Sequence, residues 1–235
     1  MRDLILIGVT GHTESVLDSA LSMKSFDNVH LIEPAATEPR DFHGFKVHAG
    51  VSRIKELMEQ GARDTFIACG CIGGYGRRLE YYELAITLGL RLINVIDPSA
   101  CVSTLAEMGQ GVFVGKQGVV NAFAKVGPMA IINTGATVDH NCDIAAFTNI
   151  APGAILCGSV STGLVAYIGA GSVIRECMHI GAGAFVGMGS LVLKDVPEGK
   201  MVYGRPAQVV GDYRLNGPTR VEDIPSLNQT RENTK

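Results

Sequence analysis

The chain has 235 residues, enough to bury a hydrophobic core in one large domain or two small ones. Its formal net charge of -3 and isoelectric point of about 6.1 provide none of the basic surface that nucleic-acid binding requires, so nucleic acid is not an expected partner. With 29 glycines, no tryptophan, and charged residues at only 18%, the composition is typical of a repetitive β architecture with close backbone approaches.

The first part of the chain alternates short apolar runs with amphipathic stretches. Apolar runs occur at residues 4–7, 29–32, 65–68 and 92–96. A helix-like stretch ending at Leu21 follows the first run, and another at about residues 77–88 precedes the last. This alternation predicts a Rossmann-like α/β domain over residues 1–97, with a parallel sheet covered by helices.

Two glycine-containing loops of this domain are candidate phosphate sites. Gly8 and Gly11 lie between the first strand and its helix, where a phosphate can meet free helical N–H groups, and Glu33 follows the second strand, where a carboxylate can hold a ribose hydroxyl. A tight turn explains the G-x-x-G pattern equally well. The second loop, CGCIGGYGRR, is either a phosphate cradle containing Gly73 and Arg77 or a plain loop.

After Pro98 the hydrophobic period becomes six. Every sixth residue from Val102 to Val192 is Leu, Ile or Val in fourteen of sixteen cases, Met108 and Thr162 being the exceptions, although these types make up only 59 of the 235 residues. Such a period does not fit a helix of 3.6 residues per turn, but it fits short strands separated by tight corners. The sequence therefore predicts a β-solenoid.

These patterns divide the chain into three segments. We expect the α/β domain over residues 1–97, the β-solenoid with a segment that caps its end over 98–212, and a loosely ordered polar tail over 213–235. The N-terminal apolar run is too short for a signal-peptide core, and no stretch approaches the roughly 20 apolar residues of a membrane span. We expect a cytoplasmic protein without a membrane span, and the scattered cysteines predict no metal site.

The hexads have the form [LIV]-[GAED]-x-x-[STAV]-x, as at residues 168–173 and 180–185. They resemble the left-handed parallel β-helix of the hexapeptide-repeat acyltransferases. With Gly8-x-x-Gly11-His12, the ACG…GGYGRR segment and Asn133…His140, residues 3–210 resemble the sialic acid O-acetyltransferase and PglD-like group of sugar acetyltransferases. The left hand of the helix is implied by this resemblance alone.

The resemblance implies a homotrimer that uses acetyl-CoA and binds a nucleotide-activated amino sugar through its N-terminal domain. The residues that would bind the nucleotide sugar are Gly8, Gly11, His12, Glu33, Gly73 and Arg77. His140 would be the general base, with Asn133 as a positioning neighbour and Asn141 as a residue that orients the imidazole. The acetyl-CoA groove would include Asn149, Gly158, Gly187, Arg205 and Pro206.

Two positions depart from the pattern of the group. Members usually carry an acid directly after the catalytic histidine, where this chain has Asn141, and N-acetylating members often carry a second histidine where it has Asn149. Asp139, Asp143 or an acid of another subunit could assist the base instead.

His140 is the histidine of the repeat that is best placed for proton transfer. It occupies the third place of the hexad that begins at Val138, so its ring should project outward from the solenoid, where an imidazole can act as a general base. A surface histidine without chemistry is the alternative.

The predicted reaction is direct transfer of an acetyl group to the amine of a UDP-, dTDP- or GDP-linked 4-amino-deoxy sugar for surface glycan synthesis. The open alternatives are O-acetylation of a sialic-acid-like nonulosonate and a non-catalytic β-helix scaffold.

Overall fold

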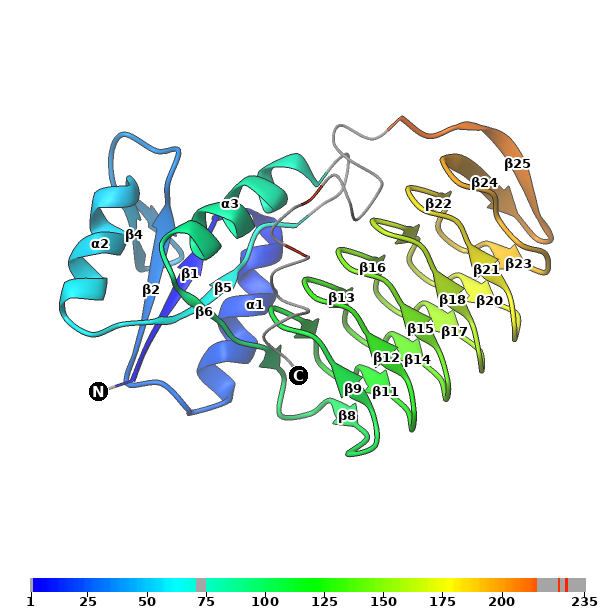
Figure 1. Cartoon of the computed structure of the whole chain (residues 1–235), viewed down its shortest axis with the longest axis horizontal. Helices are drawn as coiled ribbons and strands as arrows, with labels where there is room; N and C mark the ends of the chain where they lie inside the picture. The colour runs from blue at the N-terminus through cyan, green and yellow to red at the C-terminus, as the bar shows by residue number, and fades with distance from the viewer. Residues whose placement is uncertain (1, 71–74, 215–223, 225–226, 228–235) are drawn as a thin grey trace. The chain divides into compact units, whose positions relative to one another are not determined.

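The computed structural model describes residues 2–70, 75–214, 224 and 227 (Figure 1). The chain divides into two compact units, one formed by residues 1–72 and 76–98 and the other by residues 73–75 and 99–235. Within the described part of the chain, no helix is both long enough and apolar enough to cross a membrane.

The first unit is a Rossmann-like α/β domain, as predicted. Its sheet has the strand order β3-β4-β2-β1-β5-β6, in which β3 and β4 are antiparallel and the other pairs are parallel. The strands are β1 (Asp3–Ile7), β2 (Asn28–Glu33), β3 (Arg40–Phe42), β4 (Phe45–Ala49), β5 (Asp64–Ile67) and β6 (Arg91–Leu92), with β7 (Val95–Ile96) following. The helices are α1 (Gly11–Ser22), α2 (Val51–Glu59) and α3 (Gly76–Thr87).

The second unit is a left-handed parallel β-helix with three faces of two-residue strands, which confirms the prediction from the hexads (Figure 1). Face 1 contains β10 (Phe113–Val114), β13 (Ile131–Ile132), β16 (Asn149–Ile150), β19 (Tyr167–Ile168) and β22 (Phe185–Val186). Face 2 contains β8 (Cys101–Val102), β11 (Val119–Val120), β14 (Thr137–Val138), β17 (Ile155–Leu156), β20 (Val173–Ile174) and β23 (Leu191–Val192). Face 3 contains β9 (Glu107–Met108), β12 (Lys125–Val126), β15 (Asp143–Ile144), β18 (Ser161–Thr162) and β21 (His179–Ile180).

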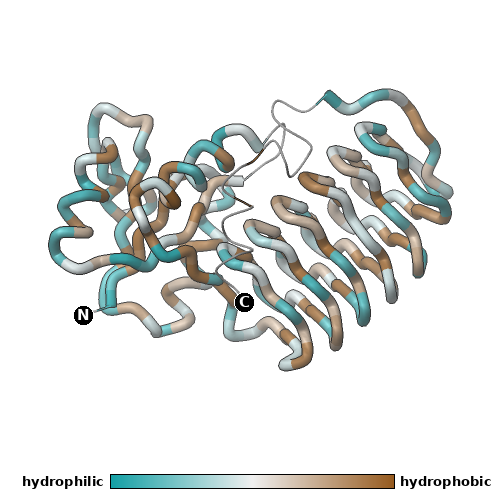
Figure 2. The backbone as a smooth tube through the Cα atoms, viewed as in Figure 1, coloured by the Kyte–Doolittle hydropathy of each residue, from teal (hydrophilic) through white to brown (hydrophobic). Residues whose placement is uncertain are grey.

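Each coil lies in register on the next, so that Val120 pairs with Val138, which pairs with Leu156. The second residue of each strand points into the prism, and from Val114 to Val192 these side chains are buried in every coil. Figure 2 shows hydrophobic positions recurring along successive coils. The period of six therefore records one inward residue for each face of the prism.

Many of the corner glycines are required by the close stacking of the coils. A Cβ atom on Gly127 would lie 2.7 Å from the backbone nitrogen of Ala146 in the next coil, and one on Gly109 would lie 2.6 Å from that of Pro128. Real Cβ atoms do not approach backbone this closely. Glycine after the inward aliphatic residue is thus a packing requirement rather than a sign of ligand binding.

An antiparallel hairpin continues the β-helix at its C-terminal end. It consists of β24 (Lys200–Gly204) and β25 (Ala207–Asp212), and β24 pairs in parallel with β22 of face 1. The predicted polar tail at 213–235 lies almost entirely outside the described residues.

Candidate active site

His140 lies on the corner of residues 139–142, which joins β14 of face 2 to β15 of face 3. Asn141 has a left-handed backbone with φ of 58°, a conformation that asparagine tolerates better than most residues. Cys142 turns inward and is fully buried, whereas the His140 side chain is exposed. The corner therefore presents the imidazole to solvent.

The His140 ring lies directly over Gly158, which occupies the same place one coil later. A Cβ atom on Gly158 would lie 2.6 Å from Cε1 and 2.7 Å from Nε2 of the ring. Gly158 thus differs from the corner glycines that face backbone, because its missing side chain makes room for the imidazole. The sequence analysis placed Gly158 in an acetyl-CoA groove and did not predict this contact.

Two polar side chains hold this corner. The Asn141 side-chain amide lies 3.0 Å from Nδ1 of His140. Asp139 Oδ1 accepts hydrogen bonds from the His140 backbone N–H at 2.7 Å and from Asn121 Nδ2 at 2.8 Å. These bonds, that of Asn121 first, lower the pKa of the Asp139 carboxyl. Asp139 therefore fixes the backbone beneath His140, and Asn141 contacts the ring.

Asn133 and Asn149 lie away from this corner. Asn133 begins the corner between faces 1 and 2, at the other end of β14, and its Oδ1 accepts the Thr134 N–H at 2.8 Å. Asn149 is 6% exposed on β16 of face 1, which does not border the corner of His140. One chain alone therefore does not bring these two residues together with the imidazole.

The predicted acetyl-CoA residues near the C-terminus form a separate group at the end hairpin. Gly187 is buried under the Tyr203 ring, which a Cβ atom at position 187 would overlap. Arg205 and Pro206 are exposed in the turn between β24 and β25, joined by a cis peptide bond.

In the first unit, the predicted nucleotide-binding loop is built around Gly8 and Glu33. Gly8 has φ of 86°, and a Cβ there would lie 3.0 Å from the Tyr81 ring, while Gly11 opens α1 with free space around it. Glu33 accepts the Val9 N–H at 3.0 Å through Oε2 and the Tyr81 hydroxyl through Oε1. Burial, followed by the bond to Glu33, raises the pKa of Tyr81. Glu33 thus orders the loop, and each carboxylate oxygen keeps a lone pair for a further donor.

The other predicted residues of this loop differ in accessibility. Burial lowers the pKa of His12 to about 3, with a smaller contribution from Arg78, so the His12 imidazole is neutral at neutral pH. Arg77 is exposed near the start of α3, whereas Arg78 is buried and donates to the carbonyls of Ile67 and Cys69, each at 2.8 Å. Gly73 lies outside the described residues.

Arg40 is a basic residue at the same loop that the sequence analysis missed. It lies on β3, and its Nη2 donates to the Val9 carbonyl at 3.1 Å. Its proximity depends on the β3–β4 hairpin. The two-residue turn of this hairpin contains Gly44 with φ of 83°, and this glycine was the sequence signal that could have revealed it.

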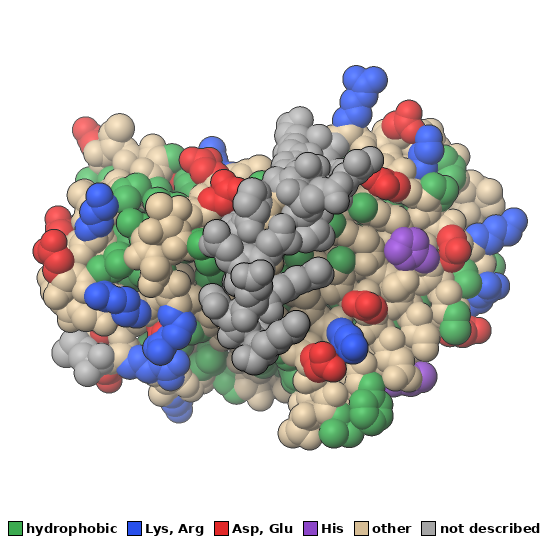
Figure 3. Space-filling view, in the orientation of Figure 1, with side chains coloured by type: hydrophobic (Ala, Val, Ile, Leu, Met, Phe, Trp, Pro, Cys, Tyr) green, Lys and Arg blue, Asp and Glu red, His purple; other side chains and the backbone are tan. Residues whose placement is uncertain are grey.

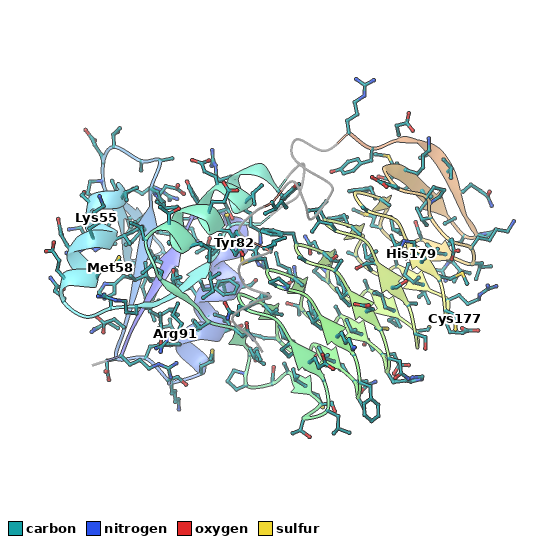
Figure 4. All side chains as sticks on the ribbon, viewed as in Figure 1. Lys55, Met58, Tyr82, Arg91, Cys177 and His179 are labelled. Atoms are coloured by element: carbon teal, nitrogen blue, oxygen red, sulfur yellow. The ribbon has the colours of Figure 1, made fainter. Side chains whose placement is uncertain are left out.

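Face 3 carries a groove of about 820 Å³ that does not include His140. Its lining includes a row of polar side chains from successive strands, among them Lys125, Asp143 and Ser161. Figure 3 shows acidic, basic and histidine side chains on the surface of the β-helix. His179, labelled in Figure 4, belongs to this row, and its Nδ1 lies 2.9 Å from Ser161 Oγ. His179 therefore lies on a strand, two coils beyond β15, with one ring nitrogen engaged by a hydroxyl.

The fold recurs in solved structures. A single-site variant of the GDP-perosamine N-acetyltransferase from Caulobacter crescentus, in complex with CoA and GDP-perosamine, is 33% identical over 90% of this chain and 98% of that chain, with a TM-score of 0.82. The acetyltransferase domain of PglB from Neisseria gonorrhoeae FA1090, in complex with acetyl coenzyme A, is 32% identical over 89% and 99%, with a TM-score of 0.81. The chain belongs to the hexapeptide-repeat sugar acetyltransferases of the PglD/NeuD-like family.

WeeI from Acinetobacter baumannii has the same fold, with a TM-score of 0.73 at 23% identity over 89% of this chain and 100% of that chain. No family model matches the sequence. As a sugar acetyltransferase of this family, the chain is an acetyl-CoA-dependent enzyme. In the described part of the chain, no group of three or more His, Cys, Asp or Glu side chains is arranged to hold a metal ion.

Proposed function

We propose that this enzyme transfers the acetyl group of acetyl-CoA to the amine of a nucleotide-activated 4-amino-deoxy sugar, a building block for surface glycans. The observation that carries the proposal is the exposed His140 ring, seated on Gly158 at a corner of the β-helix. The CoA and GDP-perosamine bound to the Caulobacter enzyme support these two classes of reactant.

His140 acts as the general base in this proposal. The neutral amine attacks the thioester carbonyl, a C–N bond forms, and Nε2 of His140 takes the proton that the nitrogen loses. The C–S bond then breaks, and the imidazolium returns the proton to the CoA thiolate. The backbone N–H of Gly158 donates to no acceptor within the described residues, so it is available to the developing oxyanion.

The transfer needs no acyl-enzyme. Burial raises the pKa of Cys142 to about 11, which leaves its thiol protonated, and the pKa of Cys157 is also raised, chiefly by burial. A protonated thiol is a poor nucleophile. The cysteine nearest the corner of His140 in sequence is therefore structural.

Asn141 takes the place of an acid in orienting the base. For Nε2 to accept a proton, Nδ1 must carry one. The structure places Asn141 Nδ2 3.0 Å from Nδ1, and turning the amide over puts Oδ1 there instead, where it can accept the Nδ1–H. The two ends of the Asn141 amide exchange by rotation about its last side-chain bond. Asn141 thus fixes the tautomer without adding a negative charge. Asp139 does not orient the ring in its place, because its carboxylate already accepts the His140 backbone N–H.

The active site is shared between copies of the chain, in a homotrimer. Asn133 and Asn149 do not border the corner of His140 in the same chain, so a second copy would have to supply them. The outer row of face 2, which borders that corner, contains Ile155, Val173 and Leu191, and the Ile155 side chain is 41% exposed. Burying such apolar side chains favours association between copies.

The proposed reactants also suggest where the enzyme works. Cys101, Cys142, Cys157 and Cys177 are free thiols, as is usual in a reducing compartment. Together with its use of acetyl-CoA, this supports a place in the cytoplasm.

An acetyl-transfer assay with labelled acetyl-CoA tests the proposal. The acceptors would be UDP-, dTDP- and GDP-linked 4-amino sugars and a free sialic acid. We expect label on one of the nucleotide-linked amino sugars. Label on the sialic acid alone would instead establish O-acetylation, and label on no acceptor would favour a scaffold.

The base is tested in the same assay with His140→Ala. This variant should lose at least ~100-fold in turnover, the usual scale for a general base, while CoA binding measured by calorimetry is retained. Near-normal turnover would remove His140 from the mechanism.

A further inference from the structure

The corner between faces 1 and 2 ends at an aromatic ring. Successive coils place Asn133, Ala151, Gly169 and Gly187 in one column, and β24 adds Tyr203 as its last member, since Val186 pairs with Val202. Tyr203 is the only large side chain of this column, and it lies across Gly187, where any Cβ would overlap its ring. Gly187 is therefore a seat for Tyr203 rather than an open part of a groove.

The Tyr203 ring is held in place but not covered. Its centroid lies 6.1 Å from that of Phe185, which itself stacks on Tyr167 at 4.7 Å with an angle of 4° between the rings. Yet Tyr203 is 40% exposed, and the neighbouring Met188 is 76% exposed. A rigid aromatic surface open on one side is well suited to stack on another planar ring, because little side-chain entropy is lost on binding.

We propose that Tyr203 is the stacking platform for the adenine of acetyl-CoA, and that Arg205 meets a phosphate of the same nucleotide. This inference rests on the proposed function. Four steps along the column separate Asn133 from Tyr203, about 19 Å at the usual strand spacing, which suits the long pantetheine and diphosphate arm between thioester and adenine. Arg205 is exposed two residues after Tyr203 in the hairpin turn, where its guanidinium can pair with phosphate oxygens.

A truncated donor separates adenine binding from chemistry. In Tyr203→Leu an apolar side chain still covers Gly187, but the aromatic face is lost. We expect the KM for acetyl-CoA to rise about tenfold, or 1.4 kcal/mol, within the range known for a base stacked on an aromatic ring. The KM for S-acetylpantetheine, which has no adenine, should stay the same, as should kcat with either donor.

Two further variants serve as controls. Tyr203→Phe keeps the aromatic face and should restore the KM for acetyl-CoA. Tyr213→Leu removes another ring of the same cluster, 4.6 Å from Phe185, and should leave the ratio of the two KM values unchanged. Equal effects of Tyr203→Leu on both donors, or no effect on either, would overturn the platform.

Direct binding keeps this test independent of the acceptor. Calorimetry with 3′-phospho-ADP, the nucleotide part of CoA, should show about tenfold weaker binding to Tyr203→Leu than to wild type. If wild type binds this nucleotide but acetylates no acceptor, the proposed function fails while the platform stands. If wild type acetylates an amino sugar and Tyr203→Leu binds the nucleotide normally, the platform alone fails.

Discussion

At the scale of single residues, the position that most constrains the base is Gly158. The His140 ring occupies the space that a side chain at position 158 would need. A Cβ atom on Gly158 would lie within 2.7 Å of both Cε1 and Nε2 of the ring. A base must reach the attacking nitrogen within hydrogen-bonding distance, so a small rotation of the ring is costly.

Replacing Gly158 with alanine should therefore impair chemistry more than binding. The added methyl group displaces the imidazole, and we expect kcat to fall about 100-fold, the scale of losing a general base, with a nearly unchanged dissociation constant for CoA. Steady-state kinetics with calorimetry would measure both. Gly211→Ala is the matched control, because a Cβ there meets no atom within 4 Å, and it should behave like wild type. If Gly158→Ala weakened CoA binding and kept kcat, Gly158 would belong to the groove alone.

His12 gives a second prediction at this scale, on the pH dependence of stability. Its pKa is about 3 in the folded protein and about 6.5 when unfolded, so the unfolded chain binds the extra proton between these values. Stability should consequently fall as the pH drops from 6.5 toward 3, by up to about 1.4 kcal/mol per pH unit from this group. Thermal unfolding of wild type and His12→Gln between pH 7.5 and 4.5 isolates the effect, since the carboxyl groups are common to both. The variant should lose less stability on acidification; parallel curves would contradict a buried neutral imidazole.

At the scale of elements, the repeat made the β-helix predictable. An inward aliphatic residue at every sixth place fixes which side chains enter the prism, so the exposed position of His140 also followed from its place in the hexad. In the first unit, β1, β2, β5, α1 and α3 followed from the apolar runs and the stretches between them, and the last run corresponds to β6 and β7. By contrast, β3, β4 and α2 were not predicted, because their apolar signal is sparse: β4 buries only Val47, and α2 only Ile54 and Leu57.

The contacts of the site were less predictable than its fold. The contact between the His140 ring and Gly158 joins two residues that are 18 positions apart. It depends on the side-chain rotamer that points the ring toward the next coil, and no pattern of residue types reveals a rotamer. The same holds for Tyr203 over Gly187. In both cases a glycine assigned to cofactor binding by family resemblance makes room for a neighbouring ring, and only the stacked coils show which glycines face backbone and which face a side chain.

At the scale of the whole molecule, the separation of Asn133 from His140 leads to the last prediction. If the active site forms between copies, with the base from one and Asn133 from the next, two inactive variants should complement each other. Co-expressed His140→Ala and Asn133→Ala chains mix at random, leaving both residues intact at about one in four interfaces of a closed ring. The mixture should then recover about a quarter of the wild-type activity, although each variant alone is impaired.

Copurification through two different affinity tags, with mass determination by light scattering, would verify that the mixed species is a trimer. Activity no higher than the mean of the two separate variants would mean that each chain carries its own complete site, and the proposed sharing between copies would have to be abandoned.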